Sequence, residues 1–172
     1  AHCDTDQVAS SLPIDSASAI RETVPVLAAL NRLGFGRRVA QNLQTLFRKQ
    51  KRTGAWGHDH GSAWATGQVL WALLDHVRLT GNQRLLARLY PAVSKAGAWI
   101  DSSQKDGVLL GKADSPSDHW DAIWACAGLR EAAKAASMLN KTRDAERFIR
   151  SHGEMLEVLR EGFGDNAIPS RA

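Results

Sequence analysis

The chain has 172 residues, of which 44% are hydrophobic, and its 22 basic and 18 acidic residues give a formal net charge of +4. This length suits a single domain (1–172), and no apolar run approaches the ~20 residues of a membrane-spanning helix. The one basic run, Arg48–Arg52, is interpreted as a solvated helix end rather than a nucleic-acid-binding patch. The first residues lack a signal-peptide pattern and an initiating Met, which indicates a processed chain or an excised piece and favours a cytoplasmic location.

Hydrophobic spacing, capping residues and glycines predict an all-α fold of six helices, with no convincing strand. The expected helices are Thr23–Leu33 (from as early as Ser16), Arg37–Gln50, Ser62–Thr80, Gln83–Ile100, Ser117–Leu139 and Thr142–Glu161. Pro25 is expected in the opening turn of the first helix, where the missing N–H of proline costs least. Ser62 is expected to cap the third helix.

The expected helices alternate in character along the chain. The second, fourth and sixth each carry one apolar stripe opposite charged residues, as helices that cover a core from outside do. The third and fifth are apolar or small around most of their circumference, so they are expected to be buried on more than one side. The alternation predicts an inner layer and an outer layer.

An internal repeat accompanies this alternation. A shift of sixty residues places "SAWATG" on "AIWACA", so that Trp64 falls on Trp124, and a shift of 46 places "LGFG" on "LTGN". Repeats of this length with two helices each indicate an array of helical hairpins. We expect three antiparallel hairpins (about 16–50, 62–101 and 117–162) that form part of an (α/α)6 toroid, half of a six-hairpin catalytic domain.

The two long links of the chain, Lys51–Gly61 and Asp101–Pro116, both enter inner helices and should therefore emerge at one end of the array. Aromatic, histidine and acidic residues are concentrated on and next to these links. Loops on a rigid scaffold commonly carry binding sites, and aromatic faces with carboxylates suit sugars. The expected site consists of Asp118, Asp121 and Asp59 as candidate catalytic acids and of Trp56, His58, His60, His119, Trp120 and Glu22 as candidate substrate-binding residues.

Structural alternatives stand beside these roles. Trp56 and Trp120 suit packing under a lid as well as stacking on a ligand. Asp118 and Asp121 equally suit the first turn of a helix, where carboxylates complement the helix dipole. The four other tryptophans occupy helix stripes and are expected in the core: Trp64, Trp71, Trp99 and Trp124.

The segment "HDH" (58–60) offers two histidines and an aspartate but no further ligand in a defined spacing, so no metal site is predicted. Cys3 and Cys126 have neither disulfide-like nor metal-like spacing. No cofactor is expected.

Several of these segments carry a family resemblance. "GQVLWALLDHVRLTGNQRLLARLYPAVSKAGAWI" (67–100) resembles the second hairpin of the six-hairpin glycosidases, the bacterial glucoamylase- and glycogen-debranching-like (α/α)6 enzymes. "DHWDAIWACAGLREAAKAASMLN" (118–140) resembles their next inner helix, and "IRETVPVLAALNRLG" (20–34) resembles an early helix that in such enzymes often carries an Arg–acid pair, here Arg21–Glu22.

The resemblance implies hydrolysis of a glycosidic bond in an oligo- or polysaccharide of α-glucan type. Two carboxylates would act, with inversion, and the partner acid would lie outside this chain. Only half of the ring is present, and no acid has flanking motifs that identify it as general acid or base. The expected partner is therefore a carbohydrate, with neither nucleic acid nor membrane, together with self-association or the missing half of the toroid.

Two other hypotheses remain. "QKRTGAW" (50–56) fits a Gln-x3-Gly-x-Trp pattern and is similar to the repeat of terpenoid cyclases and prenyltransferase-like α/α barrels, in which the Gln ties a helix end to the next turn. The aspartate-rich motif of the cyclases is missing from the chain. The third hypothesis is a non-catalytic helical scaffold that binds carbohydrate.

Overall fold

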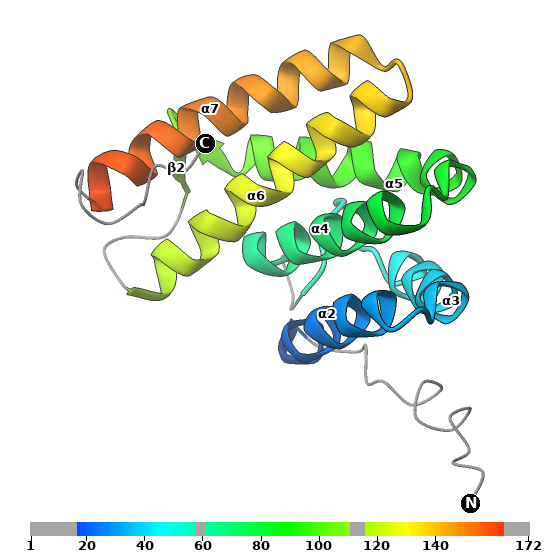
Figure 1. Ribbon diagram of the computed structural model, residues 1–172. Helices are drawn as coiled ribbons and strands as arrows, with labels where there is room; N and C mark the ends of the chain where they lie inside the picture. Colours follow the sequence, from blue (N-terminus) through cyan, green and yellow to red (C-terminus); the bar gives the residue numbers. More distant parts are fainter. Residues whose placement is uncertain (1–16, 58–60, 111–115, 164–172) are drawn as a thin grey trace, which may run out of the picture.

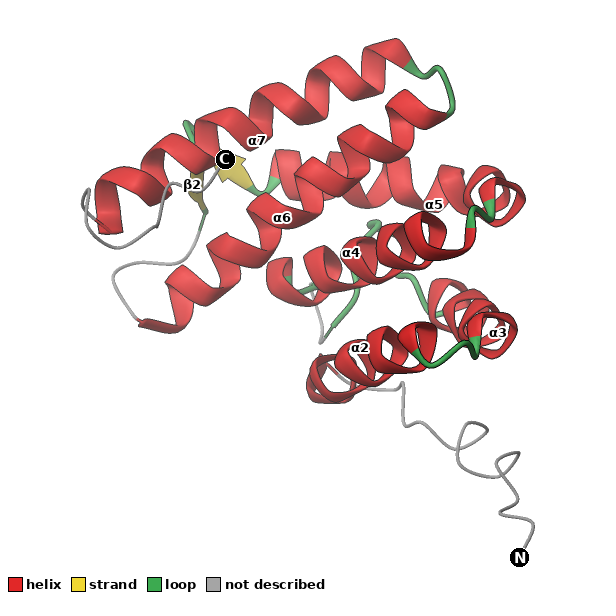
Figure 2. Ribbon diagram, in the orientation of Figure 1, coloured by secondary structure: helices red, strands yellow, loops and turns green. Residues whose placement is uncertain are grey.

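The computed structural model describes residues 17–57, 61–110 and 116–163, and in these ranges the chain is all-α (Figures 1 and 2). The helices are α2 (Ala17–Arg32), α3 (Gly36–Arg48), α4 (Ala63–Thr80), α5 (Gln83–Ser102), α6 (Pro116–Met138) and α7 (Thr142–Phe163). The two short strands are β1 (Gln104–Lys105) and β2 (Val108–Leu109). No helix of the described ranges is long and apolar enough to cross a membrane.

The expected helices are confirmed to within a few residues, and for the first of them the earlier of the two expected starts, near Ser16, is the correct one. That helix begins at Ala17, so Pro25 lies in its interior and not in its opening turn. Proline cannot donate a helical hydrogen bond, and Pro25 is exposed, so water can satisfy the carbonyl that it leaves open. Ser62 does precede α4 in an extended conformation, but its side chain makes no capping hydrogen bond. Its carbonyl instead accepts from the Thr66 hydroxyl at 2.7 Å.

The six helices form two layers. α4 packs against α2 on one side and α6 on the other, and α3, α5 and α7 pack in turn along this row (Figure 1). α4 and α6 run parallel, because Trp71 meets Trp124 and, two turns further along both helices, Arg78 meets Glu131. The expected inner and outer layers are therefore confirmed, and the helices follow the chain as three consecutive pairs.

Glycines bring α4 and α6 together. A Cβ added at Gly67 would lie 1.9 Å from the carbonyl oxygen of Trp124, and one at Gly128 would lie 2.6 Å from the Cα of Gly67. Only the absence of side chains allows the two backbones to approach this closely. The alanines that follow on α6, from Ala132 to Ala136, extend the close contact and are buried in the core.

Polar contacts connect α5 with α7 in the outer layer. The carboxylate of Asp144 on α7 accepts from the Tyr90 hydroxyl at 2.5 Å and from the Ser94 hydroxyl at 2.8 Å. Burial and the neighbouring Asp144 carboxylate raise the pKa of Tyr90, so the phenol remains a donor. Near the other end of α5, Arg147 and Ser151 bond to Asp101.

The small antiparallel sheet is the one element that the sequence interpretation missed. β1 and β2 pair Gln104 with Leu109 and Lys105 with Val108. Asp106 and Gly107 connect them with φ angles of 51° and 82°, the positive pair that a tight two-residue hairpin turn requires. In the sequence, the Asp-Gly dipeptide is the feature that could have predicted this hairpin.

Candidate functional site

The exposed part of α4 is a single narrow stripe. From Ala63 to Val77 every residue is buried except Trp64, Trp71 and Asp75. Their spacings of seven and four residues place them on one side of the helix, with Arg78 next in line. Because α2 and α6 flank α4, this stripe is the surface that the inner layer presents between them.

Residues of α2 and α6 complete an aromatic surface at the end where the inner helices begin. Trp71 and Trp124 meet edge to face with centroids 6.1 Å apart, and Trp124 and Trp120 do so at 5.9 Å. The guanidinium carbon of Arg21 lies 5.2 Å from the centre of the Trp120 ring, within the range of a cation–π contact. We call Trp64, Trp71, Trp120, Trp124 and Arg21 the tryptophan face.

Trp120 is the most accessible of the four tryptophans of this face, with 40% of its surface exposed. Trp64, Trp71 and Trp124 are half-buried. The prediction that they lie in the core was therefore only partly right: Trp64 and Trp71 pack against the core, but all three remain partly accessible to solvent. An i, i+7 pair of tryptophans in an otherwise buried helix, repeated sixty residues later at Trp124, was the signal for such a face.

Two polar pairs connect α2 to α4 beyond the tryptophan face. Arg32 donates to both carboxylate oxygens of Asp75, at 3.0 and 3.1 Å. Asn31 Oδ1 lies 2.8 Å from Nδ1 of the buried His76. The bidentate geometry makes Asp75 a bridge between the helices, because both of its oxygens are engaged.

Trp56 does not line a surface, contrary to its expected role in stacking on a substrate. Its ring is 2% exposed, meets Phe47 edge to face at 5.1 Å and donates from Nε1 to the carbonyl of Leu46 at 2.9 Å. Trp56 therefore points inward, and its indole packs against the end of α3. The alternative of packing under the link is the correct one for this tryptophan.

The Gln-x3-Gly-x-Trp pattern has the structural role that its resemblance to the cyclase repeat implied. Gln50 Nε2 donates to the carbonyls of Gly54 and Ala92, each at 2.8 Å, and so joins the end of α3 to the turn and to α5. A Cβ at Gly54 would lie 2.5 Å from the carbonyl of Lys95. The motif thus holds one hairpin against the next and supplies no reactive group.

Of the other predicted site residues, the three whose side chains the structure describes lie near the starts of α6 and α2. Asp121 is 3% exposed, one residue and about 100° around the helix from Trp120, so its carboxylate does not line the open surface. His119 and Glu22 are exposed. Asp118 lies in the first turn of α6, but its side chain is outside the described part, as are His58, Asp59 and His60.

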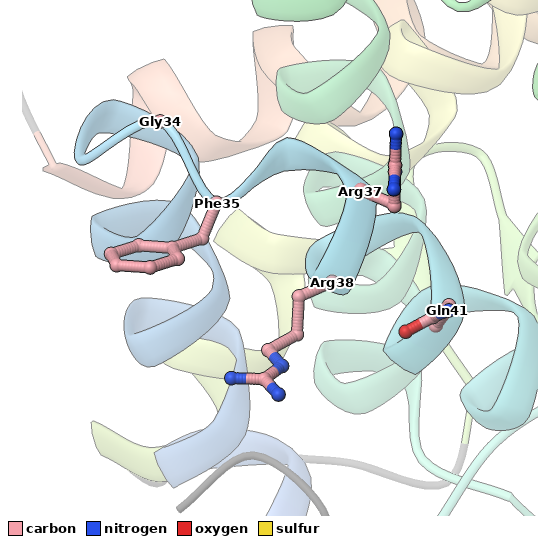
Figure 3. Close-up of a pocket in the computed structure, with 5 residues that line it drawn as sticks. All are labelled: Gly34, Phe35, Arg37, Arg38 and Gln41. Carbon is pink, nitrogen blue, oxygen red and sulfur yellow. The ribbon is translucent and has the colours of Figure 1, made fainter. Parts of the chain in front are cut away.

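A pocket of about 290 Å³ lies at the opposite end of the inner layer, at the turn from α2 to α3 (Figure 3). It is lined by Gly34, Phe35, Arg37, Arg38 and Gln41. Its lining contains no carboxylate and a single aromatic ring, that of Phe35. The pocket therefore lacks the groups of the expected chemistry.

Cys126 and His152 lie within reach of each other but do not form a nucleophilic pair. Sγ is 3.2 Å from Nδ1 of His152, which in turn lies 3.0 Å from the carbonyl oxygen of Cys126. Donating to that carbonyl occupies the nitrogen that would have to accept the thiol proton. Burial raises the pKa of Cys126 to about 11, so the group remains a thiol near neutral pH.

Within the described ranges, no group of three or more His, Cys, Asp or Glu side chains is arranged to hold a metal ion. Comparison with protein-family models, with curated proteins and with solved structures finds no match.

Proposed function

We propose that the chain binds carbohydrate on the tryptophan face, as one half of a glycosidase-like (α/α) toroid. The observation that carries this proposal is the row formed by Trp71, Trp124 and Trp120 beside Arg21. Flat indole surfaces stack on the apolar faces of sugar rings, and a guanidinium offers several donors to the hydroxyl groups at the rim of the same ring.

The packing of this row supports a binding role. Edge-to-face contacts hold the rings in defined orientations, so little conformational freedom remains to be lost when a ligand binds. Trp120 stays 40% exposed even with Arg21 against it. An accessible aromatic ring next to a cation is more typical of a ligand surface than of a core.

The proposed reaction is hydrolysis of a glycosidic bond, with inversion, by two carboxylates. Asp118 begins the helix that carries Trp120, and Asp59 lies in the link before α4, so these two are the first candidates for one acid. Asp121, which is 3% exposed, is the third candidate. Inverting sites need carboxyl groups roughly 6.5–9.5 Å apart to admit a water. The second acid is proposed to belong to a part of the ring beyond this chain.

Binding is tested by titrating the protein with mono- and oligosaccharides while tryptophan fluorescence is recorded. Trp120→Ala should weaken binding about two- to tenfold, since contacts of an aromatic ring contribute about 0.5–1.5 kcal/mol. Phe35→Ala is the matched control, because Phe35 is 41% exposed but lies at the other end of the inner layer. Loss of binding in the Phe35 variant alone would move the site to the pocket of Figure 3.

Catalysis is tested in the full parent chain with Asp59→Asn, Asp118→Asn and Asp121→Asn. Removing a catalytic acid or base should lower kcat at least about a hundredfold. Full hydrolytic activity in all three variants would reject these residues as catalytic. Sugar binding without hydrolysis in the parent chain would favour the non-catalytic scaffold.

A further inference from the structure

A fully buried carboxylate on α6 is paired with more cationic side chains than its neutralisation requires. The side chain of Glu131 is 0% exposed and is reached by Arg78 from α4 and by Arg130 and Lys134 from its own helix. The Nη2 of Arg130 lies 3.1 Å, and the Nζ of Lys134 3.7 Å, from Oε1. We call Arg78, Arg130 and Lys134 the basic cluster.

Neutralising the buried Glu131 carboxylate explains only one of the three cations of the basic cluster. One cation neutralises a buried carboxylate, and a cation in the last turn of α4 also suits the helix dipole there. Three cations on one carboxylate leave two positive charges in excess. The three side chains are 45%, 45% and 49% exposed, whereas their shared carboxylate is inaccessible. The buried Glu131 carboxylate thus positions the three cationic side chains, whose remaining N–H donors are accessible to solvent.

The basic cluster continues the tryptophan face along the same two helices. Trp71 and Trp124 are in contact, and Arg78 and Glu131, each seven residues further on, are also in contact. Seven residues are two helical turns, a distance of ~10 Å along the axis. Between these two contacts the Arg32–Asp75 pair cancels its own charge. A ligand lying along α4 therefore meets indole rings at one end and uncompensated cations at the other.

From this juxtaposition we infer that the carbohydrate is acidic, with carboxylate or sulfate groups that bind the basic cluster while a sugar ring stacks on the tryptophan face. The inference rests on the proposed function and narrows its substrate class, because the family resemblance alone implied a neutral glucan. Guanidinium groups bind carboxylate and sulfate oxygens with paired hydrogen bonds. Ring-shaped neutral sugars would gain nothing from the excess charge.

The test compares ligands that match in length and differ in charge. Tetragalacturonate, a sulfated tetrasaccharide and maltotetraose are titrated separately, with inorganic phosphate as a fourth arm, and tryptophan fluorescence and calorimetry report binding. At least one acidic tetrasaccharide should bind about tenfold or more tightly than maltotetraose, as expected for one or two added charge-assisted hydrogen bonds. That advantage should shrink as salt is added, since the cations are half-exposed.

The variant Arg130→Gln/Lys134→Gln leaves Arg78 on Glu131 and should abolish the advantage without changing the binding of maltotetraose. Arg84→Gln/Arg88→Gln on α5 removes the same charge from two exposed positions away from the inner layer and should leave every affinity unchanged. Circular dichroism checks that each variant is folded, and Lys134→Gln alone, which removes the longest of the contacts, replaces the double variant if it unfolds.

The outcomes separate the two proposals. Equal affinity for maltotetraose and both acidic ligands overturns the inference and leaves carbohydrate binding standing. Phosphate binding as tight as that of the acidic tetrasaccharides also overturns it, because the sugar would then contribute nothing. Failure of every saccharide to bind rejects the inference together with the proposed function.

Discussion

At the scale of single residues, His76 is an ionisable side chain in a buried environment that disfavours its charged form. It is 1% exposed, its Nδ1 lies 2.8 Å from Asn31 Oδ1, and its Nε2 lies 3.4 Å from the Thr80 hydroxyl. Burial lowers the pKa of His76, and the nearby Asp75 only partly opposes this. His152 is shifted in the same direction, again chiefly by burial. Both histidines are therefore neutral in the folded protein near neutral pH.

This predicts a loss of stability on mild acidification. A histidine in the unfolded chain titrates near a pKa of 6.5. Below about pH 6.5 the unfolded state therefore binds protons that the folded state does not bind. The free energy of unfolding then falls as pH decreases. The slope approaches about 1.4 kcal/mol per pH unit for each histidine until its lower folded pKa is reached. Urea unfolding between pH 7.5 and 5 measures it. His76→Gln should flatten the profile, whereas His119→Gln, at an exposed position, should not.

At the scale of the elements, backbone approach and side-chain ties hold the helices together. Gly67 and Gly128 set the distance between α4 and α6, and Gln50 ties α3 to α5 through the carbonyls of Gly54 and Ala92. Both devices act on backbone atoms, so they fix the positions of helices regardless of the side chains around them. The tryptophan face depends on the close approach at Gly67 and Gly128, because the backbone of Trp124 contacts α4 at Gly67.

Gly67→Ala should destabilise the protein by about 3 kcal/mol or more, since its Cβ would overlap the Trp124 carbonyl and force the two helices apart. Gly153→Ala on α7 is the control, because nothing lies within 4 Å of the added Cβ. That change should stabilise by about 0.5–1 kcal/mol through the better helix propensity of alanine. Chemical denaturation measures both; similar effects in the two variants would contradict the backbone contact.

Gln50→Ala should cost about 1–3 kcal/mol of the free energy of unfolding, because two part-buried carbonyls lose their donor. Gln41→Ala, an exposed glutamine on the same helix, should change stability by less than about 0.5 kcal/mol. Thermal melts of the two variants give the comparison. A neutral Gln50 variant would show that water replaces its side chain at the turn.

At the scale of the whole molecule, the described part of the chain presents the sides of an open array. Val26 is 41% exposed on α2, the inner helix at one end of the row, and Leu33, in the turn directly after it, is 71% exposed. Ile123 is 43% exposed on α6 at the other end. α4, which has an inner helix on each side, exposes no comparable aliphatic residue before its last turn. Exposed apolar sides of this kind favour association.

We therefore expect concentration-dependent self-association of the isolated chain in sedimentation velocity. Val26→Lys/Leu33→Lys should reduce it, because the charges would be placed on the open side of α2. Ile149→Lys on α7, at a position that is 51% exposed in the outer layer, should not. A sharply monomeric species at every concentration, without binding of an apolar dye, would count against the open array.

The sequence by itself determined the helices and their layers. Helix formation and one-sided or all-round apolar patterns depend on residues within a few positions of each other, so the periodicities of 17–48, 63–102 and 116–163 suffice to predict them. The tight Asp106–Gly107 turn was equally local and was missed. Most of the site depended on contacts between residues more than fifty positions apart, as in the pairs Trp71–Trp124 and Arg78–Glu131, and those only the tertiary structure could decide. Packing of the link against α3 buried Trp56, while parallel packing of α4 on α6 brought Trp71 to Trp124 and Arg78 to Glu131. Burial and pairing of side chains are set by neighbours in space, and for these residues the neighbours lie on other helices.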